Sequence, residues 1–348
     1  MPISRGNALK LVSGAGAAAL AGVPLGARAQ AKRTLDIQLL GNGLGIHVPG
    51  TAAIFEGIPA MAGLESPKVT RIDQIRTLAA NLVAGSTELA TSGPTGIFGA
   101  DEQGGDVKII GYFYRNTSLV FVANVDKIKT YKDLEKAGNI VAVNGRGDIT
   151  EVMLLGPLIK NGVDLSKVQF VEIGGSSGRM RALLAGRVAA VPVHFDQAAE
   201  IAKQGPYKNL FEPWTFYKNW VNEAWAAKGS WLRKPENRRA AVDVLKATTL
   251  AFRRANRDFA WYVQMYHAYC TLPDAKTATE ATLRPLWTKL ATEVKAWPDQ
   301  NILTPADFRE LLPIYRSAGD ITGSVRVSDV VDSSLGEQAM KELGRQGL

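Results

Sequence analysis

Residues 144–151 combine glycines and a cation with amide, hydroxyl and carboxylate groups, a mixture suited to ligand binding. An apolar helical pattern follows at 152–160, so this loop is expected to open a helix. Backbone amides and the dipole at a helix N-terminus favour an anion or another polar group. No Gly-Lys-Ser/Thr follows, so the loop is not a Walker A sequence. We expect ligand contacts from Gly145, Arg146, Asp148 and Thr150, with the alternative that Asp148 or Thr150 only caps the helix.

Residues 168–196 indicate a strand, a glycine turn, a helix and a second strand. The runs 168–173 and 189–193 are short and apolar, as is typical of buried parallel strands. Gly186 stands where a glycine would end the helix between them. Ligands of open α/β sheets lie beyond the carboxyl ends of the strands. The candidate residues at those ends are Gly174, Gly175, Ser176, His194 and Asp196.

Three strand ends in the first half of the chain provide further candidates. Strand 34–40 runs into a glycine-rich turn, strand 88–91 into a tight loop, and strand 107–114 into a cation and an amide. The first turn lacks the third glycine of a dinucleotide fingerprint, and no acidic residue ends the next strand, 69–72. We interpret it as a bare turn that approaches a ligand. These ends contribute Asn42, Gly43, His47, Ser92, Gly93, Thr95, Arg115 and Asn116.

A short sequence motif occurs once in each half of the chain. LVAG at 82–85 and LLAG at 183–186 each end a helical pattern and precede a strand. Their glycines lie 186 − 85 = 101 residues apart, about the size of one small domain. The shared context predicts two α/β lobes of one design that face each other across a cleft. From residue 235 the pattern is helical almost to the end.

A secreted hydrolase is the alternative function. Residues 174–178 match the G-x-S-x-G nucleophile elbow, with Ser176 as the nucleophile. Only His194 and His267 follow it, and neither has the expected context of a catalytic base. The three histidines and one cysteine also lack metal-ligand spacing, so we expect no metal and no cofactor.

Length and charge set outer bounds on the function. The 348 residues are enough for two sizeable cores. The net charge is +8, but the basic residues are scattered and no nucleic-acid motif accompanies them, so no nucleic-acid partner is expected. Cys270 is the only cysteine and is expected to be a buried apolar residue.

Residues 1–29 have the pattern of a cleavable signal peptide. Arg5 and Lys10 precede a small-residue apolar stretch at 11–25, and an A-x-A cleavage site ends at Ala29. A second A-x-A at 29–31 leaves two possible cuts. Gly6 replaces the second arginine of a twin-arginine signal, which favours Sec export. No cysteine follows the apolar stretch, so no lipid anchor is expected at the cleavage site.

Together these segments resemble the periplasmic solute-binding proteins of ABC importers, in the nitrate/sulfonate/taurine and pyrimidine-precursor group. The resemblance covers residues 34–231 and rests on five segments, with the tail matching only as a helical region. The segments are residues 82–93, KIIGYFYRNTSLVFVA at 108–123, IKTYKDLEKAGNIVAVNGRGDITE at 128–151, VEIGGSSGRMRALLAGRVAAVPV at 171–193 and HFD at 194–196.

The resemblance implies a type II periplasmic-binding-protein fold of α/β class, with two lobes, two crossovers and a helical tail that packs on lobe one. Lobe one would comprise residues 30–123 and 221–348, and lobe two residues 124–220. The implied protein is a periplasmic monomer without catalytic activity. It would capture a small solute in the cleft and deliver it to an ABC permease and its ATPase at the inner membrane.

Two departures from the group bear on the solute. Arg146 and Asp148 stand where the group usually has a run of hydroxyls, and His194 and Phe195 stand where a tryptophan often precedes the acid. The solute expected here is anionic, a sulfonate, a carboxylate or a related compound. The physical reason is that Arg146 and Arg115, from facing lobes, could converge on one anionic group.

The alternative is a neutral or cationic pyrimidine-type solute. Asp148 lies two residues from Arg146 and could neutralise it. Asp196 and His194 would then bind the ligand.

Overall fold

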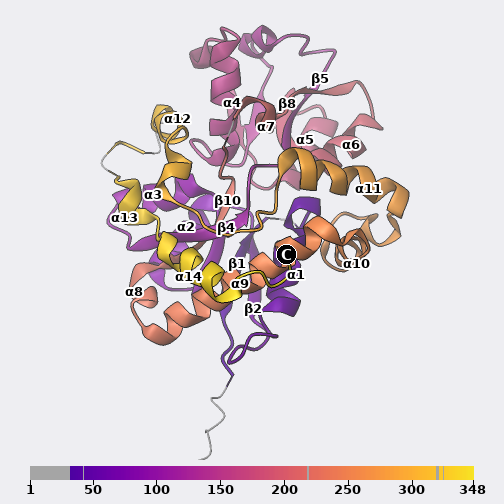
Figure 1. The fold of residues 1–348 in the computed structure, drawn as a ribbon. Coiled ribbons are helices and arrows are strands. Elements are labelled where there is room, and N and C mark those ends of the chain that lie inside the picture. The colour runs from indigo at the N-terminus through magenta and orange to yellow at the C-terminus, as the bar shows by residue number, and fades with distance from the viewer. Residues whose placement is uncertain (1–31, 42, 218, 319–320, 324) are drawn as a thin grey trace, which may run out of the picture. The chain divides into compact units, whose positions relative to one another are not determined.

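The computed structural model describes residues 32–348 except 42, 218, 319–320 and 324 (Figure 1). Two five-stranded mixed sheets, each with its own helices, form two α/β lobes. The predicted signal peptide at 1–29 and the candidate residue Asn42 lie outside the described residues. No described helix is both long and apolar enough to span a membrane.

The sheet of lobe one has the strand order β2-β1-β3-β10-β4. β1 pairs in parallel with β2 and β3, whereas β10 lies antiparallel between β3 and β4. β10 therefore comes from the returning chain and completes the sheet. The strands are β1 (Asp36–Leu40), β2 (Lys68–Ile72), β3 (Leu89–Ser92), β4 (Val107–Tyr114) and β10 (Glu223–Lys228).

The sheet of lobe two repeats this design in the order β7-β6-β8-β5-β9. β6 pairs in parallel with β7 and β8, and β5 lies antiparallel between β8 and β9. The strands are β5 (Leu119–Asn124), β6 (Val141–Val143), β7 (Phe170–Glu172), β8 (Ala190–His194) and β9 (Tyr207–Phe211). Residues 119–123, which the predicted boundary assigns to lobe one, thus belong to the sheet of lobe two because β8 and β9 bond to both edges of β5.

Two crossovers connect the lobes, as the resemblance implies. The first lies between β4 and β5, and the second precedes β10. They run side by side, because the amide of Asn116 donates to the carbonyl of Trp220 at 2.9 Å and Asn116 pairs with Val221. Asn116 adopts a left-handed backbone, with φ of 56°, which an asparagine tolerates better than most residues.

Helical segments connect the strands of both lobes. In lobe one they are η1 (Gly45–His47), α1 (Val48–Ala52), η2 (Ala53–Gly57), α2 (Ile75–Ala84) and α3 (Pro94–Glu102). In lobe two they are η3 (Tyr131–Glu135), α4 (Ile149–Lys160), η4 (Leu165–Lys167), α5 (Ser176–Leu184), α6 (Phe195–Ala202) and α7 (Pro213–Phe216).

The helical tail packs mainly on lobe one. Trp225 of β10 is fully buried and donates to Thr248 of α9 at 3.2 Å. Burying one such indole contributes on the order of 4–6 kcal/mol of transfer free energy. Lys289 also reaches lobe two, where it pairs with Glu212 at 2.7 Å. The tail comprises α8 (Gly229–Leu232), α9 (Pro235–Arg257), α10 (Phe259–Tyr269), η5 (Ala275–Thr277), α11 (Glu280–Thr288), η6 (Lys289–Val294), η7 (Pro305–Phe308), α12 (Leu312–Ser317), α13 (Val327–Val330) and α14 (Ser333–Leu343).

Candidate functional site

A cavity of about 50 Å³ lies between the two lobes, where strands of both sheets end, and we call it the interlobe cleft. Both lobes contribute polar side chains to it. Its walls are formed by Leu40, Gly41, His47, Ile75, Tyr114, Leu119, Asn144, Ile149, Thr150, Gly175, Ser176, Arg179, His194, Asn222 and Glu223. Five of the predicted site residues are among them: His47, Thr150, Gly175, Ser176 and His194.

The wall from lobe one centres on Glu223, the first residue of β10. His47 Nδ1 accepts a hydrogen bond from the amide of Leu44 at 3.2 Å, so the ring proton lies on Nε2. That Nε2 faces Glu223 Oε2 at 3.4 Å. Asn222 donates to Tyr114 Oη at 2.7 Å, and burial raises the pKa of Tyr114 well above its ordinary value, with the Glu223 carboxylate adding to the effect. The Glu223 carboxylate thus lies between the His47 ring and a protonated tyrosine.

Two acceptor atoms of the cleft wall are buried without a hydrogen-bond partner among the described residues. They are Glu223 Oε1 and Asn144 Oδ1. Glu223 is only 1% exposed, so water reaches its carboxylate poorly. A buried polar group without a partner costs about 1–3 kcal/mol, and a charged one more. A bound solute that donates hydrogen bonds would remove this cost.

The wall from lobe two contains a buried arginine. Arg179 of α5 is 2% exposed, and its Nε donates to the carbonyl of Pro192 at 2.8 Å. Another of its nitrogens donates to the carbonyl of Gly174. Burial lowers the pKa of Arg179 to about 10, against the attraction of Asp148, so the guanidinium remains charged at pH 7. Arg179 ties the strand and the glycine turn together and brings one positive charge to the cleft.

His194 ends β8 and faces lobe one. Its Nδ1 lies 2.5 Å from Ser118 Oγ, and its ring centre lies 5.1 Å from that of His47. Burial, with smaller contributions from His47 and Arg179, holds the pKa of His194 well below its ordinary value. The imidazole is therefore neutral at pH 7 and contributes hydrogen-bonding capacity rather than charge.

Asp148 is the N-cap of α4, and its carboxylate bonds to the first turn of that helix. Its carboxylate accepts from the amides of Thr150 at 2.8 Å and Glu151 at 3.3 Å. Burial raises the pKa of Asp148 to about 6 although these bonds act in the other direction. Thr150 Oγ1 accepts from the amide of Asn144 at 2.8 Å, and the same threonine lines the cleft.

Arg115 and Arg146, which were expected to converge on one ligand, both bond to protein side chains in this structure. Arg146 donates to both oxygens of Glu151, at 3.0 and 2.9 Å, and its side chain is 54% exposed. Arg115 lies in the first crossover and bonds to Asn219 of the second at 3.3 Å. Neither arginine lines the cleft. Glu151, on the first turn of α4, holds Arg146 away from the cleft. The pairing of the two crossovers holds Arg115 away from it.

The other predicted residues surround the cleft or join the lobes. Gly145 and Gly174 lie beside Asn144 and Gly175, whereas Asn116 donates to the carbonyl of Val294 in the crossover region. At Gly93 a Cβ atom would come within 3.3 Å of Ile149, so the glycine lets the lobes approach closely. Gly43, Ser92, Thr95 and Asp196 lie outside the cleft wall.

Asp196 joins the lobes rather than lining the cleft. Its Oδ2 accepts from the amide of Gly45 at 3.1 Å, and its Oδ1 accepts from the amide of Gln197 at 3.0 Å. Ser92 and Thr95 are buried in lobe one. The amide of Thr271 donates to the carbonyl of Gly43.

Ser176 has no histidine partner. The hydrogen bonds of His194, His47 and His267 go to Ser118, Leu44 and Ala278, respectively. A nucleophile elbow requires a base within hydrogen-bond reach of the serine. The described residues also contain no group of three side chains that could hold a metal ion.

Six residues with polar side chains at or beside the cleft are not among the predicted site residues. Glu223 carried the clearest signal, because it interrupts an apolar strand pattern, and a buried charge in such a place is expensive unless it has a function. Tyr114 directly precedes Arg115, at the end of the strand that the sequence predicts. The six are Tyr114, Ser118, Asn144, Arg179, Asn222 and Glu223.

The family model described as NMT1/THI5 like matches residues 69–255, more than half of the chain, and the chain belongs to this family. This confirms the group inferred from the sequence. A search of curated proteins found no significant match.

Solved structures share the fold at low sequence identity. A ligand-binding component of an ABC-type import system from Staphylococcus aureus, with zinc bound, has a TM-score of 0.72 at 12% identity, over 88% of this chain and 99% of that one. The nitrate-binding protein NrtA of Synechocystis has a TM-score of 0.70 at 14% identity, over 90% and 89%. The alkanesulfonate-binding protein SsuA of Xanthomonas axonopodis, bound to MOPS, has a TM-score of 0.68 at 15% identity, over 87% and 99%. The periplasmic-binding-protein fold is thereby confirmed, and these neighbours are binding components rather than enzymes.

Proposed function

We propose that the protein is a periplasmic solute-binding protein that captures a small polar solute in the interlobe cleft and delivers it, as a monomer, to an ABC permease and its ATPase. The observation that carries the proposal is the unpartnered Oε1 of Glu223, buried in a cavity between two lobes. Burying a carboxylate oxygen without a partner is costly, and a solute that binds there would compensate for it. The names of the structural neighbours support the same role.

The preferred solute carries N–H groups, as an amine, an amidine or an amino heterocycle does. The unpartnered atoms of Glu223 and Asn144 in the cleft wall are both acceptors. Arg179, the buried cation at the cleft, already donates to two carbonyls. A bare anion would therefore face the Glu223 carboxylate. These observations favour the neutral or cationic pyrimidine-type alternative over a sulfonate or carboxylate.

An anionic solute is the second candidate. The charge of Arg179 and the N-terminus of α5, which begins at Ser176, both adjoin the cleft from lobe two. A helix N-terminus and a guanidinium both favour negative charge. The two candidates therefore differ in which wall supplies the dominant contact: Glu223 of lobe one or Arg179 of lobe two.

Capture requires that the lobes open and close. The cavity of about 50 Å³ is bounded by contacts between lobes, including Asn144 Nδ2 to the carbonyl of Asp73 at 2.7 Å and Arg76 to the carbonyl of Arg146 at 2.6 Å. A solute can enter only when these contacts part. Rotation about the two crossovers would provide this motion, as in other hinged binding proteins.

A melting-temperature screen tests the proposal. Matched solutes with and without an amino group, together with nitrate, sulfonates and carboxylates, are added to the wild type and to Glu223→Gln. A solute at 100 times its Kd should stabilise the fold by about 2.7 kcal/mol. We expect stabilisation by an N–H-bearing compound and its loss in Glu223→Gln. Stabilisation by sulfonates alone, unchanged in the variant, would favour the second candidate, and hydrolysis of an ester abolished by Ser176→Ala would favour an enzyme.

A further inference from the structure

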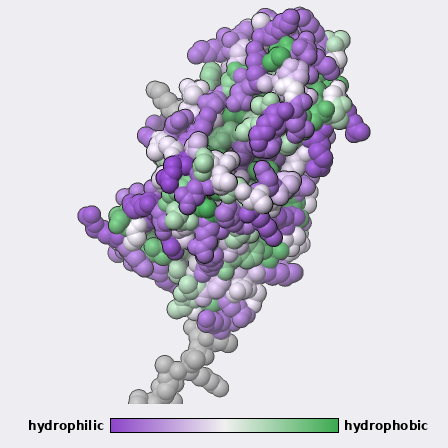
Figure 2. Space-filling view, turned by 90° about the vertical axis from the view of Figure 1, so that its right-hand side faces the viewer, coloured by the Kyte–Doolittle hydropathy of each residue, from purple (hydrophilic) through white to green (hydrophobic). Residues whose placement is uncertain are grey.

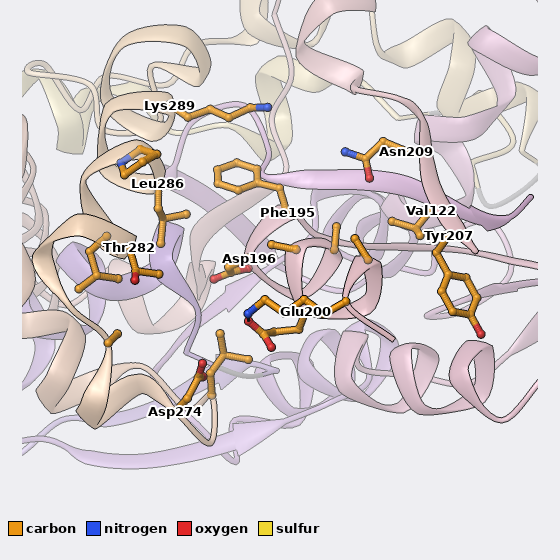
Figure 3. A pocket seen from close by; sticks show the side chains of 18 of the residues that line it. Val122, Phe195, Asp196, Glu200, Tyr207, Asn209, Asp274, Thr282, Leu286 and Lys289 are labelled. Carbon is orange, nitrogen blue, oxygen red and sulfur yellow. Dashed lines mark hydrogen bonds and ion pairs between the residues drawn. The ribbon is translucent and has the colours of Figure 1, made fainter. Parts of the chain in front are cut away.

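A second and larger cavity, of about 600 Å³, lies between α6 and β9 of lobe two and α11 of the tail. We call it the outer groove. In Figure 3, Thr282 and Leu286 of α11 and Lys289, the first residue of η6, lie on one side, and Val122, Tyr207 and Asn209 lie on the other. Phe195, Asp196 and Glu200 of α6 lie between them. The groove and the interlobe cleft share no lining residue among those described.

Apolar side chains from both lobes form most of the surface of the outer groove. Lobe two contributes Phe195, Ala198 and Ala199, and the tail contributes Leu283 and Leu286. The face that carries α10 and α11 is otherwise largely hydrophilic, with hydrophobic residues visible among the polar ones (Figure 2). A cavity of this volume with apolar walls has the size and character of sites that hold small organic molecules.

The charged groups of the outer groove are mostly neutralised by protein partners. Lys289 pairs with Glu212 at 2.7 Å, and its Nζ lies 5.4 Å from the centre of the Phe195 ring. Lys203 pairs with Glu200 at 2.5 Å. Both carboxylate oxygens of Asp196 accept backbone N–H groups. Lys208 and Asp274 are solvent-exposed and of opposite sign, so the groove offers no net charge to an occupant.

We propose that the outer groove is a second binding site, for an uncharged, largely apolar small molecule that contacts both lobes. Apolar walls favour an occupant by removing its surface and their own from water, at about 25 cal/mol per Å². Lys289, Lys203 and Glu200 are already engaged in ion pairs, so an ionic ligand would have to compete with these or rely on the solvent-exposed Lys208 and Asp274. Because the two walls belong to different lobes, the occupant bridges α6 and α11.

The test uses the uncharged fluorescent probe N-phenyl-1-naphthylamine with the full-length mature protein. Ala199→Trp fills the groove from α6, and Leu286→Gln makes the α11 wall polar. We expect each variant to weaken probe binding at least tenfold. Ala199 is exposed, so the wild-type melting temperature is expected for Ala199→Trp. The matched control is Ala80→Trp, at an exposed alanine of α2 outside both cavities, which should bind the probe as the wild type does.

Several results would overturn the proposal. Absence of probe binding, or binding unchanged in both variants, would show that the groove is not the site. Loss in only one variant would indicate a surface patch on a single lobe. Tighter binding of the anionic probe 8-anilinonaphthalene-1-sulfonate would contradict the uncharged class. None of these results affects the proposed capture of a solute at Glu223, because the two cavities are lined by different residues.

Discussion

The interlobe cleft and the outer groove are both formed by the two lobes, yet they differ in how their polar groups are satisfied. In the groove, Lys289, Lys203 and Asp196 all have protein partners. In the cleft, Glu223 and Asn144 each keep a buried acceptor without one. The groove is the larger of the two, at about 600 Å³ against about 50 Å³. Unsatisfied buried groups, rather than volume, therefore distinguish the site that we assign to the polar solute.

The largest effect is expected when one carboxylate in each cavity is replaced and the solute affinities of the two variants are compared. Glu223→Gln should lower the affinity for an N–H-bearing solute by about 2–5 kcal/mol, because a desolvated charged contact is lost. Glu200→Gln, the matched change beside the outer groove, should leave that affinity within twofold of the wild type, since Glu200 only pairs with Lys203 at the surface. Isothermal titration calorimetry measures both. Equal losses in the two variants would contradict the distinction.

Asp148 provides a prediction on stability. Burial raises the pKa of Asp148 from 3.8 to about 6, so the folded protein holds this proton more tightly than the unfolded chain does. The associated stability is present below about pH 4 and is lost as pH rises through 6. Each pKa unit corresponds to about 1.4 kcal/mol, which gives a change of about 3 kcal/mol between pH 4 and pH 7.

Urea unfolding of the wild type and Asp148→Asn at both pH values measures this contribution. The free energy of unfolding of the wild type, relative to the variant, should fall by about that amount from pH 4 to pH 7. Asp274→Asn, at an exposed position of the outer groove, is the control for general effects of removing a carboxylate. A difference between wild type and Asp148→Asn that stays constant with pH would contradict the burial argument.

The smallest effect is expected at the two arginines that the sequence favoured. Arg146→Ala removes an ion pair in which the arginine side chain is 54% exposed and the Glu151 side chain is buried. Neither Arg146→Ala nor Arg115→Ala should change solute affinity by more than twofold, because neither side chain lines the cleft. Calorimetry under the conditions used for Glu223→Gln tests this. A tenfold loss of solute affinity in either variant would instead support the hypothesis that these arginines bind an anionic solute.

The fold was largely predictable because strand ends and glycine turns are local signals. β4 (Val107–Tyr114) has the bounds that its apolar run predicts, and α5 lies between the glycines expected to flank it. The predicted site residues that line the cleft, such as His47 and His194, stand at strand ends or in the turns that follow them. Such positions can be predicted from the sequence without knowledge of tertiary contacts, because ligands of α/β sheets lie beyond the carboxyl ends of the strands.

The remainder depends on contacts between segments far apart in the sequence. Arg146 could not be assigned from its own loop, because Glu151 and Asp148 compete for it and only the fold decides which pairs. Glu223 starts the returning strand, and its place opposite His47 follows from insertion of β10 between β3 and β4. The place of β5 in the sheet of lobe two likewise depends on strand pairing, because β5 pairs with β8 and β9.

Native mass spectrometry of the protein as purified from cells grown in rich medium tests the central claim most directly. The spectrum reports whether a small molecule is bound and gives its mass, and fragmentation identifies its functional groups. We predict one bound solute per chain that carries N–H donors, retained by the wild type and by Glu200→Gln and lost from Glu223→Gln. A bound sulfonate, carboxylate or nitrate without N–H groups that is retained by Glu223→Gln would contradict the claim that Glu223 recognises the solute.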